Sequence, residues 1–375
     1  MKSEILPVLA RWYALHARDL PWRRTRDAYR IWISEIMLQQ TRVNAVIPYY
    51  ERFLQCLPDV SALAQVDDEV LHKLWEGLGY YSRAKNLKRA AGEILTRFGG
   101  CMPLTYDELL TLPGIGDYTA GAVASIAGGQ CVPAVDGNVL RVWTRLQNDA
   151  RSITDPATKA AVRADLADAM QQAQPMLEPW FGPDKMQFFL RFACKNDCIV
   201  QQELHAFRTV AGSVNAALME LGATVCIPGG KPKCEICPVA GFCQAAQAGT
   251  QMLLPVKQAK KARRVEEKTV FVLLLDGMPL GMKRPDSGLL AGLWQLPESE
   301  GILDENTALQ QLSAWRISPV GPLLFYKRKH VFTHVEWRMQ VCALTVHCEG
   351  ALPEGWVPLD ADKALPTAYR VCLPG

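Results

Sequence analysis

The chain has 375 residues, 49% of them hydrophobic and 21% charged, with a formal net charge of +3 at pH 7. This length suits about two or three domains with a sizeable core, and the composition excludes a disordered or fibrous chain. No apolar run is long enough to span a membrane, and Glu4 and Pro7 stand where a signal peptide would have its apolar core. We therefore expect a cytoplasmic protein without a membrane partner, whose basic surfaces are local.

Residues 1 to about 245 have the patterns of helices, and residues 31–38 are apolar on every face, which predicts a buried helix. Glu35 is a carboxyl group inside that helix. Because burial raises the pKa of a carboxyl group, Glu35 is a candidate general acid. The structural alternative is an ion pair between Glu35 and Arg23 or Arg24.

Residues 78–84 follow a short predicted helix and begin another. They place Tyr80 and Tyr81 beside Arg83, a combination that suits base stacking and phosphate binding. Taken alone, this pattern has low specificity.

A glycine hairpin at residues 112–116, Leu-Pro-Gly-Ile-Gly, precedes a predicted helix from Tyr118 to Ala127. Gly114 and Gly116 can adopt backbone conformations that other residues avoid, and they let a ligand approach the main chain. The hairpin amides would then lie at a helix N-terminus, which suits a phosphate group. Asp136 follows after one short helix and a turn, so the pair suggests chemistry on a nucleic acid. The alternative is an ordinary helical corner in which Asp136 is an N-cap.

Twelve cysteines in a chain of this class argue against a disulfide framework. Four are grouped with the spacing C-x7-C-x2-C-x5-C, namely Cys226, Cys234, Cys237 and Cys243. Four thiolates can hold a tetrahedral zinc ion or an iron–sulfur cluster, and the spacing does not choose between them. Cys194 and Cys198 form a second, shorter pair, either structural thiols or a further redox or metal feature.

The composition changes after the cysteine loop. A proline and a basic run that ends at Arg263 and Arg264 indicate a linker at 244–268. Strand-like runs follow at 269–275, 323–326, 329–334 and 337–341, with one helix at about 305–315, so we expect a small α+β domain. The predicted division is a helical domain at 1–225, a metal-binding loop at 226–243, the basic linker at 244–268 and the α+β domain at 269–375.

The hairpin, Asp136 and the cysteine loop together resemble the helix-hairpin-helix DNA glycosylases of the endonuclease III superfamily. Three further segments resemble the MutY-type adenine DNA glycosylases: Ile-Ser-Glu-Ile-Met-Leu-Gln-Gln-Thr at 33–41, Trp-Glu-Gly-Leu-Gly-Tyr-Tyr-Ser-Arg at 75–83 and Gly-Leu-Leu-Ala-Gly-Leu-Trp at 288–294. The resemblance implies a mainly α N-terminal region of two helical lobes and a loop holding a [4Fe-4S] cluster rather than zinc. It also implies that the α+β domain is a Nudix-like domain that recognises the lesion.

The same resemblance implies that adenine opposite 8-oxoguanine or guanine in duplex DNA is flipped out and excised. Glu35 would protonate adenine N7, and Asp136 would stabilise the oxocarbenium ion of the sugar, as paired carboxyl groups do in retaining glycosidases. Tyr118 and Asn138 match positions that support the acid and the sugar side of the site. Tyr118 stands where strand-cutting relatives carry a Schiff-base lysine, so we expect a monofunctional glycosylase.

The resemblance also assigns residues that contact DNA or the lesion. Gly114 and Gly116 match the phosphate-binding hairpin, and Gln40 and Tyr80 match residues that enter the base stack. The positions that match the surface reading the oxidised guanine are Thr41, Leu78, Phe332, Thr333 and His334. Thr333 stands where many members have serine, and it keeps the hydroxyl group.

Three departures from the family pattern affect these expectations. Ala216 stands where the family has Gln or Glu contacting the adenine edge, so selectivity would depend on other groups such as Arg23. An extra segment around 185–205, which contains Cys194 and Cys198, is expected to form an added helix or to supply a replacement adenine contact. Glu298 fits a Nudix box, but its paired glutamates are replaced by Asn306-Thr307, so we expect no pyrophosphate hydrolysis.

Two other functions remain open at this stage. A glycosylase for mispaired thymine or uracil is compatible with Ala216, although the C-terminal domain argues against it. A non-catalytic, cluster-containing DNA-binding protein would need neither Glu35 nor Asp136. For the favoured function we expect a bacterial, nucleoid-associated monomer whose DNA binding is sensitive to salt.

Overall fold

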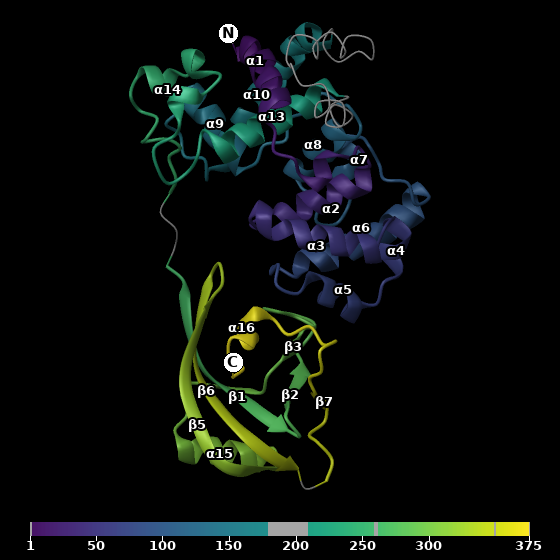
Figure 1. Ribbon diagram of the computed structural model, residues 1–375, viewed down its shortest axis with the longest axis vertical. Coiled ribbons are helices and arrows are strands. Elements are labelled where there is room, and N and C mark those ends of the chain that lie inside the picture. The colour runs from purple at the N-terminus through teal and green to yellow at the C-terminus, as the bar shows by residue number, and fades with distance from the viewer. Residues whose placement is uncertain (1, 179–208, 259–261, 349, 375) are drawn as a thin grey trace. The chain divides into compact units, whose positions relative to one another are not determined.

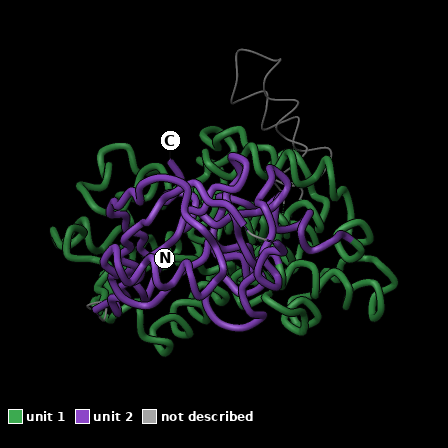
Figure 2. Tube along the Cα trace, turned by 90° about the horizontal axis from the view of Figure 1, so that it is seen from below, with its two compact units in different colours: residues 1–65, 85–259 green, residues 66–84, 260–375 purple. Residues whose placement is uncertain are grey.

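The computed structural model describes residues 2–178, 209–258, 262–348 and 350–374 (Figure 1). The chain forms two compact units: Met1–Gln65 with Lys85–Ala259, and Val66–Ala84 with Lys260–Gly375 (Figure 2). The grouping of Val66–Ala84 with the C-terminal residues is not contained in the sequence prediction. The extra segment around 185–205, with Cys194 and Cys198, lies outside the described residues.

The N-terminal two thirds of the chain is helical, as predicted. Its α-helices are α1 (Lys2–His16), α2 (Ala28–Leu38), α3 (Val43–Cys56), α4 (Val60–Gln65), α5 (Asp68–Trp75), α6 (Ser82–Phe98), α7 (Tyr106–Leu110), α8 (Asp117–Ile126), α9 (Gly137–Leu146), α10 (Pro156–Leu177), α13 (Val210–Thr224) and α14 (Gln244–Gln247). Short 3-10 helices lie at Pro21–Arg23, Cys234–Ile236 and Ala240–Phe242. None of the helices in the described ranges is long and apolar enough to cross a lipid bilayer.

One hydrophobic core of the first unit joins α1, α9, α10 and α13. Its fully buried side chains include Leu9, Trp143 and Leu218. A second group of helices places α2 against α3 and α8. Residues 31–37 of α2 are all buried, which confirms the predicted buried helix. Asp27 caps the start of α2 by accepting a hydrogen bond from the Arg30 amide at 2.9 Å.

The glycine hairpin lies between α7 and α8. Gly114 has φ +76°, and a Cβ atom there would lie 2.6 Å from Asn86 Cβ, so both its backbone and its neighbour require glycine. Gly116 has φ −100° and is the N-cap of α8. Of the two hairpin glycines, Gly114 therefore uses a conformation that other residues avoid, whereas any residue can adopt the extended backbone of Gly116. The space where its Cβ would stand is open.

The second unit contains a mixed sheet. Its strands are β1 (Arg264–Leu275), β2 (Met278–Lys283), β3 (Trp294–Gln295), β4 (Glu298–Glu300), β5 (Ile317–Val331), β6 (Val335–Cys348) and β7 (Trp356–Pro358), and its helices are α15 (Glu305–Ala314) and α16 (Thr367–Arg370), besides α5. The strand order is β3-β2-β1-β6-β5, with β4 paired to β1 and β7 to β2. Only β1 and β6 are parallel among these pairs of the described chain.

Both faces of this sheet are covered. Val270 and Val272 pack on one side with Tyr369 of α16, while Phe271 and Leu273 face the other side with Leu312 of α15. This alternation follows from the two-residue period of a strand. The predicted α+β domain and its helix at 305–315 are confirmed.

Several helices and strands begin or end at other residues than the sequence patterns predict. Strand β1 begins at Arg264, inside the predicted linker, because residues 264–274 pair with β6 over their whole length. The separate strands expected at 323–326 and 329–334 are one strand, β5, followed by a turn. At the other end of the predicted linker, α14 and residues up to Val256 belong to the first unit, where Val256 O accepts a hydrogen bond from Ile153 N at 3.0 Å.

Candidate active site

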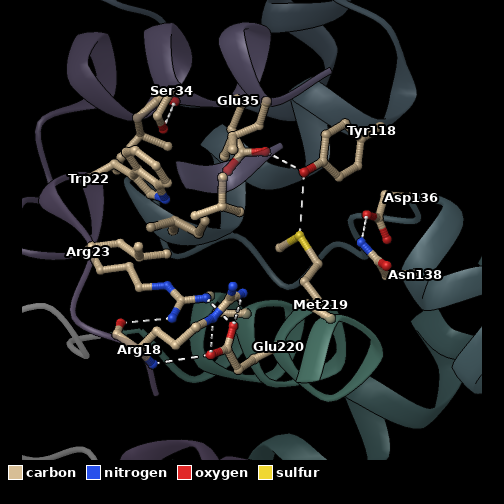
Figure 3. A pocket seen from close by; sticks show the side chains of 18 of the residues that line it. Arg18, Trp22, Arg23, Ser34, Glu35, Tyr118, Asp136, Asn138, Met219 and Glu220 are labelled. Carbon is tan, nitrogen blue, oxygen red and sulfur yellow. Dashed lines mark hydrogen bonds and ion pairs between the residues drawn. The ribbon is translucent and has the colours of Figure 1, made fainter. Parts of the chain in front are cut away.

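A pocket of about 550 Å³ lies in the first unit, lined by residues of α2, α8, α13 and the N-terminus of α9 (Figure 3). The structure brings together here the residues that the sequence singled out at distant positions. Glu35 comes from α2, Tyr118 from α8, and Asp136 and Asn138 from the start of α9. Because all four line one pocket, they can act on one bound group.

Glu35 is buried, with 6% of its surface exposed, and its Oε2 accepts a short hydrogen bond from the Tyr118 hydroxyl. Burial raises the pKa of Glu35 to about 7, opposed by the hydrogen bond from Tyr118 and reinforced by the negative charge of Asp136. Burial and the two carboxylates raise the pKa of Tyr118 well above its ordinary value, so the phenol stays protonated and donates. Its oxygen also lies 3.3 Å from Met219 Sδ.

The alternative in which Glu35 pairs with an arginine is not what the structure shows. Arg23 binds Glu220, and Arg24 Nε donates to Asp19 Oδ1 at 2.7 Å. Across the described ranges no cation forms an ion pair with Glu35. The carboxyl group is therefore available for proton transfer.

Asp136 is the N-cap of α9, as the structural alternative predicted, and it also faces the pocket. Its Oδ1 accepts from the Val139 amide at 2.7 Å, and its Oδ2 accepts from Asn138 Nδ2 at 2.7 Å. The pKa of Asp136 is raised above its ordinary value, chiefly by burial, although these hydrogen bonds and the charge of Arg141 oppose the rise. Asp136 thus has fixed donors to its ionised form, whereas Glu35 has one donor in an apolar setting.

The support behind Asp136 depends on close helix packing. Asn138 Oδ1 accepts from Arg141 Nη2 at 2.8 Å, and the same nitrogen donates to Gly222 O at 2.7 Å. A Cβ atom on Gly222 would lie 2.6 Å from Asn138 Cβ. Only glycine at this position of α13 lets the helix approach α9 so closely.

The structure adds a charged cluster in the pocket wall that sequence reasoning missed. Glu220 of α13 is fully buried, and its carboxylate accepts from Arg18 Nε at 2.8 Å and from Arg23 Nη2 at 2.7 Å (Figure 3). Burial alone raises the pKa of Glu220, but the two arginines outweigh it and lower the pKa to about 2. The available signal was an acidic residue inside the apolar run of α13, the same pattern that drew attention to Glu35.

This cluster fixes Arg23, which the sequence proposed as a substitute base contact. Arg23 also donates to Arg18 O at 2.9 Å. Ala216 lines the same pocket one turn before Glu220, and its methyl group cannot form a hydrogen bond. Any polar contact to a bound base from this wall must therefore come from other side chains.

Two of the predicted DNA-contacting residues have unusual backbones. Gln40 has φ +58° and Tyr80 has φ +48°, a region that residues other than glycine rarely adopt. Gln40 and Thr41 line the pocket of the first unit. Such conformations are often found at functional sites.

The other predicted lesion-contacting residues belong to the second unit. The Tyr80 hydroxyl lies 2.9 Å from Thr333 Oγ1, although 253 positions separate them. Thr333 and His334 are exposed in the turn between β5 and β6, which is closed by a bond from Phe332 N to Val335 O at 2.8 Å. Leu78 is buried, with 6% of its surface exposed.

The four grouped cysteines line one small cavity of about 30 Å³ beside the end of α9. Zinc would hold four thiolates about 4 Å apart, since each Zn–S bond is about 2.3 Å in a tetrahedral site. No three cysteine, histidine or acidic side chains of the described chain are close enough together to hold a single metal ion. Four thiols around one cavity provide the donor set of an iron–sulfur cluster.

Glu298, the residue that fits a Nudix box, forms hydrogen bonds with three side chains of the second unit. Its carboxylate accepts from Tyr369 Oη at 2.8 Å, Lys268 Nζ at 3.1 Å and Arg284 Nη1 at 3.3 Å. Asn306 and Thr307 occupy the first turn of α15. The side chain of Glu298 thus forms hydrogen bonds within the fold of the second unit.

Comparison with known proteins assigns families to three stretches of the chain. Residues 33–168 match the HhH-GPD superfamily of base excision DNA repair proteins, residues 230–243 match the iron-sulfur binding domain of endonuclease III, and residues 269–374 match the NUDIX domain. The adenine DNA glycosylase of Rattus norvegicus is 34% identical, with 92% of this chain and 70% of the relative aligned. The adenine DNA glycosylase of Homo sapiens is also 34% identical, with 93% and 68% aligned. A solved thermostable thymine-DNA glycosylase aligns with 66% of this chain and 97% of its own at 24% identity and a TM-score of 0.49.

Proposed function

We propose that this chain, which belongs to the adenine DNA glycosylases and carries their iron–sulfur domain, excises adenine that is mispaired with 8-oxoguanine or guanine in duplex DNA. The observation that carries the proposal is the pair of buried carboxyl groups, Glu35 and Asp136, which line one pocket but have different hydrogen-bond partners. Burial holds the pKa of Glu35 near neutrality, and Asp136 accepts hydrogen bonds from Asn138 and from the Val139 amide. In a pair of this kind, one carboxyl group can act as the general acid while the other stays ionised and stabilises positive charge.

In the proposed reaction the adenine is flipped from the duplex into the pocket. Glu35, protonated near pH 7, donates its proton to N7, and the electrons of the breaking C–N bond move onto the base. Tyr118 holds the Glu35 carboxyl group in place through its hydrogen bond. Positive charge then develops on the sugar, and the Asp136 carboxylate stabilises it until water attacks the same carbon.

Asn138 acts as a positioning residue in this scheme. Its amide donates to Asp136 Oδ2, and its own oxygen accepts from Arg141. This chain of bonds holds the carboxylate at one orientation, so little reorganisation is needed as the sugar becomes charged.

We propose that the enzyme is monofunctional. The side chain at position 118 is a phenol already bound to Glu35, and it offers no amine for a Schiff base with the sugar. The expected product is DNA with an abasic site and an intact backbone. Strand cleavage by pure protein at the rate of base release would contradict this.

For the opposite base, we propose that the exposed turn of the second unit contacts the oxidised guanine. Tyr80 and Thr333 share a hydrogen bond there, and His334 is exposed beside them. Gly114 and Gly116 would bind a phosphate, since the hairpin amides precede α8 and open space surrounds Gly116. Gln40 and Thr41 supply polar groups at the pocket.

Ala216 supports a second candidate, a related glycosylase that removes mispaired thymine or uracil. Single-turnover base release from four duplexes distinguishes the two: adenine opposite 8-oxoguanine, adenine opposite guanine, thymine opposite guanine and uracil opposite guanine. The proposal predicts release from both adenine duplexes, with the 8-oxoguanine duplex faster. Release of thymine or uracil at a higher rate would replace it with the second candidate.

A further inference from the structure

Arg145, in the last turn of α9, is a buried arginine next to the cysteine cavity. Only 5% of its surface is exposed. Its Nη1 donates to Cys226 Sγ and to Ile227 O, each at 3.2 Å, and its Nε donates to Leu254 O at 2.9 Å. The guanidinium therefore connects a cysteine and a backbone carbonyl inside the loop with the backbone of Leu254 beyond the loop.

Residues 250–256, which follow the cysteine loop, are held by hydrogen bonds to other residues of the first unit. Thr250 Oγ1 donates to Asn148 Oδ1 at 2.6 Å, and Val256 O accepts from Ile153 N at 3.0 Å. Together with the bond from Arg145, these contacts attach three points of the segment to the first unit. We call residues 250–256 the cover segment.

Gln251 of the cover segment lines the cavity that the four cysteines share. Its Oε1 is buried and has no hydrogen-bond partner in the described part of the chain. A buried polar atom without a partner is costly and calls for a physical reason. Turning the side-chain amide by 180° exchanges its oxygen and its nitrogen. The NH2 group then takes the buried position of Oε1, where it can donate to a sulfur acceptor.

We propose that Arg145 and Gln251 are two hydrogen-bond donors to the sulfurs of the iron–sulfur cluster, and that the cover segment keeps water and chelators away from it. The reduced cluster carries one more negative charge than the oxidised cluster. Donors to its sulfurs stabilise the reduced form more and raise the reduction potential. This inference rests on the cofactor and not on the base that the enzyme removes.

The direct test is the reduction potential of the purified cluster-loaded protein, measured by spectroelectrochemical titration, for the wild type and Gln251→Leu. Loss of the amide donor is expected to shift the potential to more negative values. The matched control is Gln172→Leu, because Gln172 is exposed on α10. An unchanged potential would overturn the proposal, and a shift to more positive values would show that the amide oxygen faces the cluster.

A second measurement, which does not depend on the reduction potential, tests whether the cover segment protects the cluster. Iron release to an excess of chelator is expected to be several-fold faster in Gln251→Leu and in Arg145→Lys than in the wild type and in Gln172→Leu. Lysine keeps the charge of Arg145 but cannot make its three bonds at once. Wild-type release rates in both variants would contradict protection by these residues.

Discussion

The substitution Glu35→Gln should abolish base excision and, above neutral pH, make the protein more stable. The physical reason is the burial that raises the pKa of Glu35 from 4.5 to about 7. Above pH 7 the folded wild type must keep a carboxylate in an apolar setting, whereas glutamine stays neutral and can still accept the hydrogen bond from Tyr118.

The sign of the pH dependence follows from proton binding. Between pH 4.5 and 7 the folded protein holds a proton on Glu35 that the unfolded chain has lost, so the stability of the wild type falls as the pH rises through this window. One pKa unit corresponds to about 1.4 kcal/mol, so the stability lost between pH 5 and pH 8 is ~2–3 kcal/mol. For a unit of this size the loss lowers Tm by roughly 5–10 °C.

The assay is thermal unfolding of the wild type and Glu35→Gln from pH 5 to pH 8.5, read as the difference in Tm at each pH. That difference should be near zero at pH 5 and should grow in favour of the variant above pH 6. The control is Glu51→Gln, because Glu51 is exposed on α3. Differences that stay constant across the pH range would refute the raised pKa of Glu35.

Three other predictions follow from contacts in the two units. Tyr80→Phe and Thr333→Val should each weaken binding to 8-oxoguanine duplexes by roughly 2–10-fold, since each removes one neutral hydrogen-bond partner; a double-mutant cycle that gives additive losses would deny their coupling. Gly222→Ala should slow excision by about 100-fold because the added Cβ pushes α13 from the start of α9, whereas Gly92→Ala, which meets no neighbouring atom, should not; equal rates would rule out the tight packing. Glu220→Gln should destabilise the protein by about 1–3 kcal/mol, because it removes the buried anion that accepts hydrogen bonds from two half-buried arginines; an unchanged Tm would show that the cluster contributes nothing.

Local sequence patterns predicted the parts of the fold that depend on local physics. The apolar run of α2, the glycine hairpin and the alternating strands of the C-terminal unit were all visible as short-range periodicity. The carboxyl groups of the site could be named because Glu35 interrupts an apolar helix and Asp136 precedes one. The cysteine spacing identified a metal-binding loop, and the resemblance chose the cluster.

Contacts between distant residues could not be predicted in this way. Glu220 meets Arg18 and Arg23 across about two hundred positions, and nothing local in any of the three segments indicates the pairing. The pattern of strand β5 predicts two shorter strands, because most of its side chains are exposed and give no continuous apolar pattern. Composition places the cover segment in a linker, because two of its three anchoring bonds involve backbone carbonyl groups, which composition does not reveal.

The measurement that tests the central claim most directly is the chemical identity of the base released from a duplex with adenine opposite 8-oxoguanine, for the wild type and for Asp136→Asn. Chromatography of the reaction with the wild type should show free adenine, stoichiometric with abasic sites in an uncut strand. Asp136→Asn should still bind the duplex but release at least 1,000-fold less adenine, because the charge that stabilises the sugar cation is gone. Adenine release by Asp136→Asn at the wild-type rate would contradict the two-carboxylate site.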